Sequence, residues 1–245
     1  MAQIRVLVNG ALGKMGGETC RAVQEAEDML LAGETDLDED LSAKIAEAGA
    51  DVVVDFTHPS SVRCNANTIL EAGVRGVIGT TGLSTRDTDE ISSECGRRGL
   101  GMVVAPNFTL GVVLMMRFAR EAARHFPAVE IIEMHHDRKA DAPSGTALAT
   151  AETIAQARTG SPPPRPTEKI SVEGARGGTH RGIPLHSVRL PGLLAHQEVI
   201  FGGTGQVLTI RQDTLDRKAF MPGVLLAVRK VIGLERLVFG LEELL

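Results

Sequence analysis

The stretch that decides the fold is I-R-V-L-V-N-G-A-L-G-K-M-G, residues Ile4 to Gly16. Its first six residues are an apolar run with Ile and Val, which predicts a buried strand, and Lys14–Ala26 then carries apolar residues at helical spacing. Gly10 and Gly13 lie between this strand and the helix, and Gly16 lies within the first turn of the helix. A helix N-terminus behind such a turn offers N–H groups to phosphates, so the stretch predicts a dinucleotide site.

The spacing of these glycines departs from the strict G-x-G-x-x-G pattern, but the same roles are available. Gly10 is expected to allow the tight turn, Gly13 to let a pyrophosphate approach the backbone, and Gly16 to let the helix pack on the strand. The plain alternative is a turn that binds nothing. A triphosphate-binding loop is excluded, because Met15 stands where Ser or Thr should bind magnesium and Val8 where the first glycine should be.

Asp36 follows a second predicted strand, Met29–Gly33, and lies 20 residues after Gly16. A carboxylate at this point would hold the adenosine ribose hydroxyls, although it could also be a surface acid in the acidic loop T-D-L-D-E-D. The local charges favour NADH. Leu37 occupies the place where an Arg would pair with a 2′-phosphate, and more acids follow, whereas Lys14 works the other way.

Strands alternate with helices over the first 106 residues, which predicts an α/β domain with a doubly wound parallel sheet. The further elements expected there are Asp51–Phe56, Ser61–Ala72, Val74–Ile78, Thr85–Arg98 and Leu100–Ala105. Beyond Pro106 we expect helix Leu110–His125, strand Ala128–Met134, helix Ala147–Arg158, a stiff exposed loop at Ser161–Pro166, strands Lys169–Val172, His186–Leu190, Glu198–Phe201 and Gln206–Arg211, and helix Arg217–Val231. This second part predicts a separate α+β unit with a mostly antiparallel sheet.

The bulk composition narrows the class of protein. The chain has 245 residues, 43% hydrophobic and 23% charged, which is typical of one large or two small soluble globular domains. Its net charge of −5 and the lack of Lys/Arg runs make nucleic acid and anionic membranes poor partners. The apolar runs are too short to span a bilayer, no signal peptide is expected at the N-terminus, and three widely spaced Cys indicate a reducing cytoplasm.

Reactive side chains crowd residues 133–146, which read E-M-H-H-D-R-K-A-D-A-P-S-G-T. Neighbouring strand residues point to opposite faces, so His135 and His136 would share a ligand only where the strand has ended, and no metal site is expected. Lys139 and the hydroxyls of S-G-T, before a predicted helix N-terminus, together form a natural carboxylate site. A structural His and an ordinary capped helix would each explain one part of this segment, but not the combination.

The whole chain resembles the 4-hydroxy-tetrahydrodipicolinate reductase family. The family's His-His pair, the Lys four residues after the first His, and D-A-P-S-G-T all stand within His135–Thr146. G-A-L-G-K-M-G matches the family's cofactor turn, Gly79–Gly82 its G-T-T-G, and Ala105–Phe108 its A-P-N-F hinge. Three further landmarks are similar, at His186–Gly192 (H-S-V-R-L-P-G), Glu198–Gly202 (E-V-I-F-G) and Asp216–Phe220 (D-R-K-A-F).

This resemblance implies a Rossmann-type dinucleotide-binding domain, residues 1–106 with 217–245, and an α+β substrate-binding and oligomerisation domain, residues 107–216. It implies an NAD(P)H-dependent oxidoreductase that acts on a CH–CH bond conjugated to an imine. The reaction would be reduction of 4-hydroxy-tetrahydrodipicolinate to tetrahydrodipicolinate in lysine (diaminopimelate) biosynthesis. A cytoplasmic homotetramer is expected.

The resemblance also implies roles for single residues. His135 would be the general acid that protonates the substrate after hydride transfer, and Lys139 would bind a substrate carboxylate and stabilise developing charge. The small dicarboxylate would be held by His136, Lys139, Ser144, Gly145 and Thr146. The cofactor would be contacted by Gly10, Ala11, Leu12, Gly13, Lys14, Met15, Asp36, Gly79, Thr80, Thr81, Ala105, Pro106, Asn107 and Phe108.

One departure and three alternatives remain at this point. The family often has R-H-D after its last strand, whereas Gln212 stands here in R-Q-D, so no role is carried over to it. A related reductase that acts on a different small dicarboxylate imine is the nearest alternative. A dinucleotide-sensing regulator would not need the His/Lys cluster, and a metal-dependent hydrolase using His135, His136 and Asp137 would have poor geometry.

Overall fold

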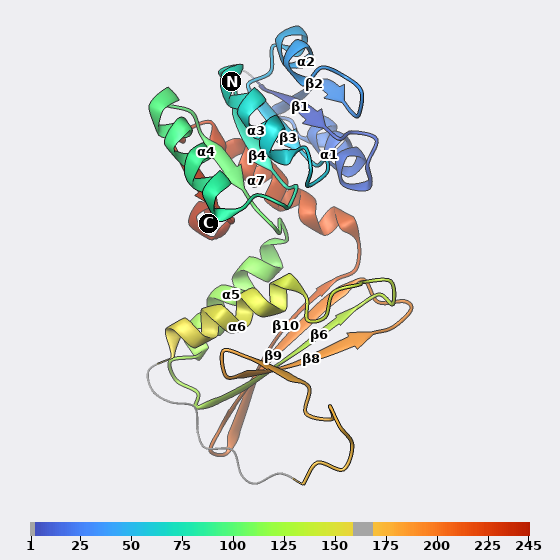
Figure 1. The fold of residues 1–245 in the computed structure, drawn as a ribbon, viewed down its shortest axis with the longest axis vertical. Coiled ribbons are helices and arrows are strands. Elements are labelled where there is room, and N and C mark those ends of the chain that lie inside the picture. Colours follow the sequence, from blue (N-terminus) through green and yellow to red (C-terminus); the bar gives the residue numbers. More distant parts are fainter. Residues whose placement is uncertain (1–2, 159–168) are drawn as a thin grey trace. The chain divides into compact units, whose positions relative to one another are not determined.

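The computed structural model describes residues 3–158 and 169–245, and it divides into two compact units. Unit 1 comprises Met1–Leu110 and Arg217–Leu245, and unit 2 is Gly111–Asp216, so the second unit is inserted into the first (Figure 1). The predicted loop Ser161–Pro166 lies outside the described residues. The predicted functional division, 1–106 with 217–245 and 107–216, stays a prediction, because compactness does not show which ligand a unit binds.

Unit 1 alternates strands with helices. Its elements are β1 (Ile4–Asn9), α1 (Lys14–Glu25), β2 (Met29–Thr35), α2 (Leu41–Ala48), β3 (Val52–Asp55), α3 (Val62–Glu71), β4 (Arg75–Ile78), α4 (Thr85–Arg98) and β5 (Met102–Val104), then η1 (Arg217–Phe220), α7 (Met221–Val231), β11 (Leu237–Phe239) and η2 (Glu242–Leu244). The strands form a six-stranded parallel sheet in the order β11-β5-β4-β3-β1-β2. The predicted Rossmann-type fold is confirmed.

Helices cover both faces of this sheet, which is why its strands are apolar throughout (Figure 1). The apolar sides of α2, α3 and α4 pack on one face around Ile45, Ile69 and Ile91. On the other face α1 and α7 contact each other, and Val23 and Val228 are fully buried there. The core of unit 1 therefore consists of two apolar layers with the sheet between them.

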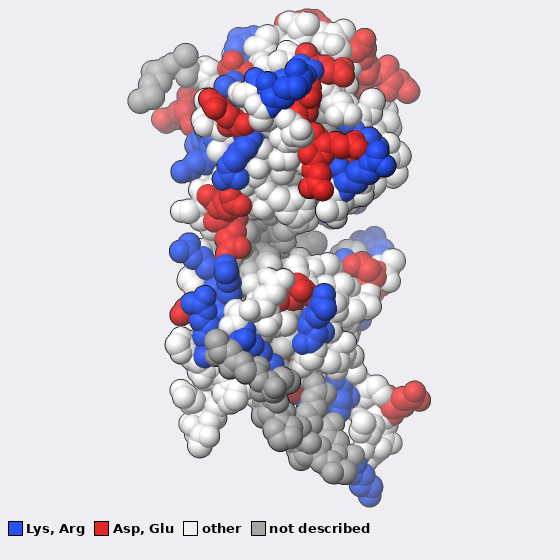
Figure 2. All heavy atoms as spheres, turned by 60° about the vertical axis from the view of Figure 1, so that its left-hand side comes forward, with Lys and Arg blue, Asp and Glu red and all other residues white. Residues whose placement is uncertain are grey.

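The surface of unit 1 carries mixed charge. Figure 2 shows basic and acidic side chains interspersed on the face it draws. Along α4 such side chains pair with one another: Arg86 Nε lies 2.8 Å from Glu90 Oε1, and Arg97 also pairs with an acid on the same helix, Glu94. Pairs of this kind are typical of a solvated helix face and contribute little to stability.

The strand order reverses at β1, which has β2 on one side and β3 on the other. In open α/β sheets ligands bind outside the carboxyl ends of the strands at this switch point. Asn9 and Asp55 end the two strands there, and Gly79 and Ala105 follow β4 and β5 at the same edge. Parallel pairing thus brings the predicted cofactor segments, which are far apart in sequence, to one edge of the sheet.

Unit 2 is a mixed sheet with helices on one face (Figure 1). Its elements are α5 (Leu110–Ala122), β6 (Ala128–His135), α6 (Gly145–Ala157), β7 (Gly178–His180), β8 (Ile183–Arg189), β9 (Ala195–Gly203) and β10 (Gln206–Thr214). The strand order is β10-β9-β6-β8-β7, with β6 and β8 parallel and the other neighbours antiparallel. Met115, Ile131, Ile154 and Phe201 lie in the core between helices and sheet.

Two sequence predictions need correction. Lys169–Val172 forms no strand, and Ile170 and Val172 are exposed there, so their alternation does not reflect a buried face. The predicted helix Arg217–Val231 begins as the 3₁₀ turn η1, and α7 starts only at Met221, where a proline occupies its first turn. The elements α2, β7 and β11 were not predicted.

Candidate active site

The glycine-rich turn brings α1 directly against the end of β1. Gly10 has φ +84°, and a Cβ there would lie 2.5 Å from the carbonyl oxygen of Phe56. A Cβ at Gly16 would lie 2.0 Å from the carbonyl oxygen of Gly10. The N-cap of α1 is Gly13, so no side chain caps the helix. The turn therefore has the backbone conformation and the uncapped helix N-terminus that a phosphate site needs.

Asp36 lies against this turn. Its Oδ2 accepts a hydrogen bond from the backbone N–H of Leu12 at 2.7 Å, and its Oδ1 accepts one from Leu37 N at 2.8 Å. Lys14 begins α1 and is exposed. The structure therefore places Asp36 beside the turn, where the sequence analysis expected a carboxylate for the ribose, and brings Ala11, Leu12 and Met15 to the same place.

A buried carboxylate that sequence reasoning missed connects the two sides of the switch point. Asp55, at the end of β3, is fully buried. Its Oδ2 accepts hydrogen bonds from Asn9 Nδ2 and Asn65 Nδ2, both at 2.8 Å. Its Oδ1 accepts from Thr80 Oγ1 at 2.6 Å and Thr57 Oγ1 at 2.9 Å. Asp55 thus joins the residue before the glycine-rich turn to the predicted G-T-T-G segment.

The segments after β4 and β5 lie close to the same aromatic residue. A Cβ at Gly79 would lie 2.0 Å from the ring of Phe56, and that ring packs edge-on against Phe108 with 5.7 Å between centroids. Asn107 Oδ1 accepts a hydrogen bond from Thr109 N at 2.8 Å, which orders the turn into α5. Thr80, Ala105 and Phe108 are buried, whereas Thr81 and Pro106 are exposed at this edge.

In unit 2 the His-His pair stands at the end of a strand. β6 ends at His135, so His136 already lies outside the strand and the strict alternation of faces does not extend to it. His136 Nδ1 is buried and has no hydrogen-bond partner in the structure. Within residues 3–158 and 169–245 no group of three or more metal-ligating side chains gathers.

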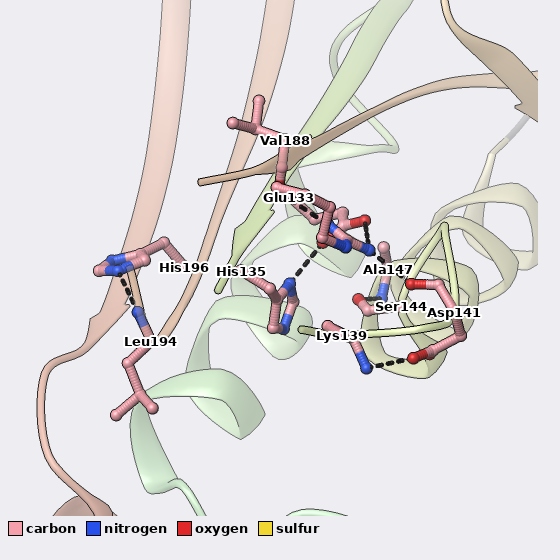
Figure 3. Close-up of polar contacts among 10 residues, drawn as sticks. Glu133, His135, Lys139, Asp141, Ser144, Ala147, Val188, Leu194 and His196 are labelled. Carbon is pink, nitrogen blue, oxygen red and sulfur yellow. Dashed lines mark hydrogen bonds and ion pairs between the residues drawn. The ribbon is translucent and has the colours of Figure 1, made fainter. Parts of the chain in front are cut away.

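His135 is held by a second missed carboxylate. Its Nδ1 lies 2.5 Å from Oε2 of Glu133, two residues back on the same face of β6 (Figure 3). The Glu133 side chain has no exposed surface, and Arg189 from β8 binds both of its oxygens, at 2.8 and 3.0 Å. Burial by itself raises the pKa of Glu133, but hydrogen bonds from His135, Arg189 and Ser187 outweigh it and lower the pKa to about 2.

The loop after β6 carries the predicted anion site. Lys139 Nζ lies 2.7 Å from Asp141 Oδ1, and this hydrogen bond holds the pKa of Asp141 below its usual value (Figure 3). Ser144 is the buried N-cap of α6, and its Oγ accepts a hydrogen bond from Ala147 N at 3.2 Å. Gly145 and Thr146 form the first turn of this helix. Lys139 thus pairs with an acid of its own loop, and the anion site expected in this segment stays a prediction.

Gln212 lies on β10, opposite Gln197 on β9. Its Nε2 donates to Thr214 Oγ1 at 3.0 Å, and its side chain packs beside Gly111. These contacts stay within unit 2 and join the end of β10 to the start of α5.

In the described part of the chain, no helix is long and apolar enough to cross a membrane.

Two family models together match nearly the whole chain. The model described as dihydrodipicolinate reductase, N-terminus, matches residues 4–108, and the one described as dihydrodipicolinate reductase, C-terminus, matches residues 111–245. The 4-hydroxy-tetrahydrodipicolinate reductase of Moorella thermoacetica is 52% identical, with 100% of this chain and 99% of that protein covered. The one of Mycolicibacterium smegmatis is 49% identical, with 99% of each covered.

A solved structure shows the same similarity. A dipicolinate-bound dihydrodipicolinate reductase from Paenisporosarcina sp. TG-14 matches with a TM-score of 0.91 and 43% identity, covering 99% of this chain and 100% of that one. The similarity therefore extends over both units and includes the glycine-rich turn and the segment that carries His135.

Proposed function

Since this chain belongs to the dihydrodipicolinate reductase family, we propose that it reduces 4-hydroxy-tetrahydrodipicolinate to tetrahydrodipicolinate with NADH or NADPH, in lysine (diaminopimelate) biosynthesis. One observation carries the proposal: the chain is 52% identical, over its full length, to a relative that bears the reductase name. The family consists of NAD(P)H-dependent oxidoreductases, so the chain is an enzyme of that class. The conversion removes water and adds a hydride and a proton.

Unit 1 offers residues that fit a dinucleotide. Gly10 and Gly16 allow the turn and α1 to approach closely, and the uncapped start of α1 can receive the pyrophosphate. Asp36 would accept hydrogen bonds from the ribose, and the segments around Thr80 and Ala105 would line the nicotinamide side. When bound, the reduced nicotinamide supplies the hydride.

Unit 2 offers residues that fit the dicarboxylate and the proton. Lys139 would bind one carboxylate and stabilise the charge that develops, and Ser144, Gly145 and Thr146 would receive a carboxylate at the N-terminus of α6. His136 would contribute to the same binding. His135 would protonate the substrate as a general acid, because its ring keeps one nitrogen for Glu133 and presents the other away from it.

We also propose that NADH is preferred over NADPH. Asp36 is held against the turn by the hydrogen bond from Leu12 N. A 2′-phosphate would need the space that the Asp36 carboxylate occupies, and the two negative charges would repel each other. Glu39 lies beside it, since its Oε2 accepts a hydrogen bond from Asp36 N at 3.0 Å. Glu39 also pairs with Lys44 of α2 at 2.9 Å, so one of the neighbouring acids is already neutralised.

Assembly and location extend the proposal. We expect a homotetramer formed through the face of the unit 2 sheet that α5 and α6 leave open, where Val188 and Val207 are exposed side chains. A cytoplasmic location fits a biosynthetic enzyme of this family. Light scattering coupled to gel filtration tests the assembly, and a stable monomer at micromolar concentration would contradict it.

The decisive experiment is the oxidation of NADH or NADPH, followed by absorbance, with freshly generated 4-hydroxy-tetrahydrodipicolinate. The proposal expects turnover with this substrate and a product that shows the mass of tetrahydrodipicolinate. No turnover here, together with turnover of another small dicarboxylate imine, would favour the related reductase. Binding of dinucleotide without any turnover would favour a regulator. Consumption of the substrate without oxidation of NADH or NADPH, abolished by a chelator, would favour a metal-dependent hydrolase.

A further inference from the structure

A buried carboxylate lies directly behind the proposed acid. Glu133 and His135 are two residues apart on β6, so their side chains share the face that α5 and α6 cover. A lone charge there would be very costly. Glu133 nevertheless has no exposed surface, and its Oε2 lies 2.5 Å from His135 Nδ1. A strand position that could hold an apolar side chain thus holds an acid aimed at His135.

Arg189 extends this contact to the loop that carries the anion site. Its two terminal nitrogens bind the two oxygens of Glu133, and its Nη2 also donates to the backbone carbonyl of Asp141 at 2.6 Å. Asp141 is the partner of Lys139. The Arg189 guanidinium therefore joins the carboxylate behind the His135 ring to the segment that bears the Lys139 ammonium.

We infer that Glu133 is a positioning residue for the reduction, which sets the tautomer and orientation of His135, and that Arg189 keeps it aligned with the Lys139 loop. This inference rests on the proposed function. A carboxylate held by a guanidinium only accepts hydrogen bonds, so His135 Nδ1 must carry a proton and donate it. Nε2 is then the nitrogen that exchanges its proton with the substrate.

The proton count follows from this geometry. Before the reaction the ring carries protons on both nitrogens, and Glu133 stabilises the resulting positive charge. Nε2 gives its proton to the substrate, and the electron pair of that N–H bond stays on the nitrogen. The neutral ring keeps the Nδ1 proton and the hydrogen bond to Glu133, so the ring does not have to turn before it is protonated again.

Among the groups that surround Glu133 and His135, the Glu133 carboxylate is the negative charge nearest to the His135 ring. On β9, the residues opposite His135 and Glu133 are Ala195 and Gln197, neither of which titrates. On β8 the charged neighbour is Arg189, and in the loop they are Lys139 and Asp141. The buried residues of α5 and α6 on this side are uncharged: Val112, Met115, Ala119, Ala147, Thr150, Ala151 and Ile154.

The same strand supplies a matched control on its other face. Glu130 also binds a histidine and an arginine, with His186 Nε2 at 2.8 Å and Arg176 Nη2 at 2.6 Å. Its side chain is 36% exposed, and these contacts do not involve the loop of Lys139. Glu130→Gln therefore removes the same chemistry from the same strand without touching the site.

The test compares Glu133→Gln with Glu130→Gln in the full-length enzyme, after thermal melting has shown that each is folded. A general acid typically contributes roughly 10²–10⁴-fold, so Glu133→Gln should lower kcat by at least about 10-fold, with little change in substrate KM. Glu133→Asp keeps a charged acceptor at this position and should keep most of kcat.

Two results would overturn the inference while wild-type turnover shows that the proposed function stands. One is a Glu133→Gln enzyme with unchanged kcat, or with a loss of kcat equal to that of Glu130→Gln. The other is a further loss of kcat when Glu133→Gln is added to His135→Gln, because a residue that acts through His135 has nothing left to position. Absence of turnover in the wild type would instead refute the proposed function.

If a variant does not fold, the inference can still be tested on the wild-type protein. Nitrogen-15 NMR of the histidine rings reports which nitrogen carries the proton in the neutral form. The inference expects the Nδ1–H form for His135 at a pH where the ring is neutral. The Nε2–H form would overturn it.

Discussion

Gly16 and Gly10 approach each other so closely that a Cβ on Gly16 would lie 2.0 Å from the Gly10 carbonyl oxygen. The neighbouring Gly17 has no such constraint, because a Cβ there would lie 3.6 Å from its nearest neighbour, an ordinary contact. Of these two adjacent glycines, only Gly16 therefore lies where a side chain would clash with the backbone. Only the first one sets how α1 packs on the turn.

Gly16→Ala should destabilise the protein and weaken cofactor binding, because the added methyl group must displace backbone. We expect a loss of roughly 1–3 kcal/mol in the free energy of unfolding and a higher KM for NADH. Gly17→Ala is the control and should be neutral or stabilising by up to about 1 kcal/mol, through helix propensity. Urea denaturation measures both, and equal losses for the two variants would contradict this account.

Asp55→Asn should disturb the cofactor side of unit 1. The amide presents a donor where the carboxylate accepts from Asn9, Asn65 and Thr80, so at least one buried polar group loses its partner. We expect a loss of roughly 1–3 kcal/mol in stability and a KM for NADH that rises more than kcat falls. Asp51→Asn at the other end of β3 is the control, and an equal rise in KM there would refute a special role for Asp55.

Lys139→Ala should raise KM for the substrate and lower kcat, since the ammonium is proposed both to hold a carboxylate and to stabilise the transition state. Steady-state kinetics and the affinity for pyridine-2,6-dicarboxylate, measured by calorimetry, report the two effects separately. Arg138→Ala removes an exposed neighbouring charge and should change neither by more than about twofold. Normal kcat/KM in Lys139→Ala would remove the residue from the proposed site.

Asp36→Ala should narrow the preference for NADH. The wild type is expected to have a higher kcat/KM with NADH than with NADPH at physiological salt, because Asp36 would repel a 2′-phosphate. Asp38→Asn removes a charge from the same loop, outside the contact with Leu12, and should narrow the preference less. If the ratio of kcat/KM for NADH to kcat/KM for NADPH is the same in Asp36→Ala as in the wild type, Asp36 does not face the ribose.

Glu133 should make unit 2 sensitive to acid. Its pKa is lowered from 4.5 to about 2 in the folded protein, so its contribution is present above pH 4.5 and is lost as the pH falls towards 2. Urea midpoints measured from pH 6 to pH 3 should fall less steeply in Glu133→Gln than in the wild type. Parallel curves would show that folding leaves the pKa of Glu133 at its ordinary value.

Some elements could be predicted from sequence with their bounds: β1 as an apolar run that ends before Gly10, and α4 as a polar helical stretch between two strands. The helix α2 was missed because its eight residues bury only Leu41, Ile45 and Ala48, within a stretch that looks like an acidic loop. Its ends do carry signals. Asp40 caps the first turn by accepting from Ser42 N, and a glycine in the left-handed region closes the last one.

The motifs of the candidate site could be recognised in the sequence, but side chains whose partners lie on another strand could not. Glu133 was visible only as an acid in an apolar strand, and its partner Arg189 lies 56 residues away on β8. Asp55 likewise reaches Asn9 across 46 residues. Such pairs follow from strand order and register, which one sequence does not specify. The three-residue strands β7 and β11 depend in the same way on the strands beside them.

The discontinuity of unit 1 has a consequence for the order of events on the ribosome. The last strand, β11, pairs with β5, and α7 packs against α1, so β5 and α1 lack these partners until the C-terminal residues have been synthesised. By contrast, all of unit 2 has been translated once Asp216 has been added. Because domains generally fold as units during synthesis, the inserted unit is the first to complete its contacts, although the other one starts first. The parallel sheet of unit 1 therefore stays incomplete while the second unit is being translated.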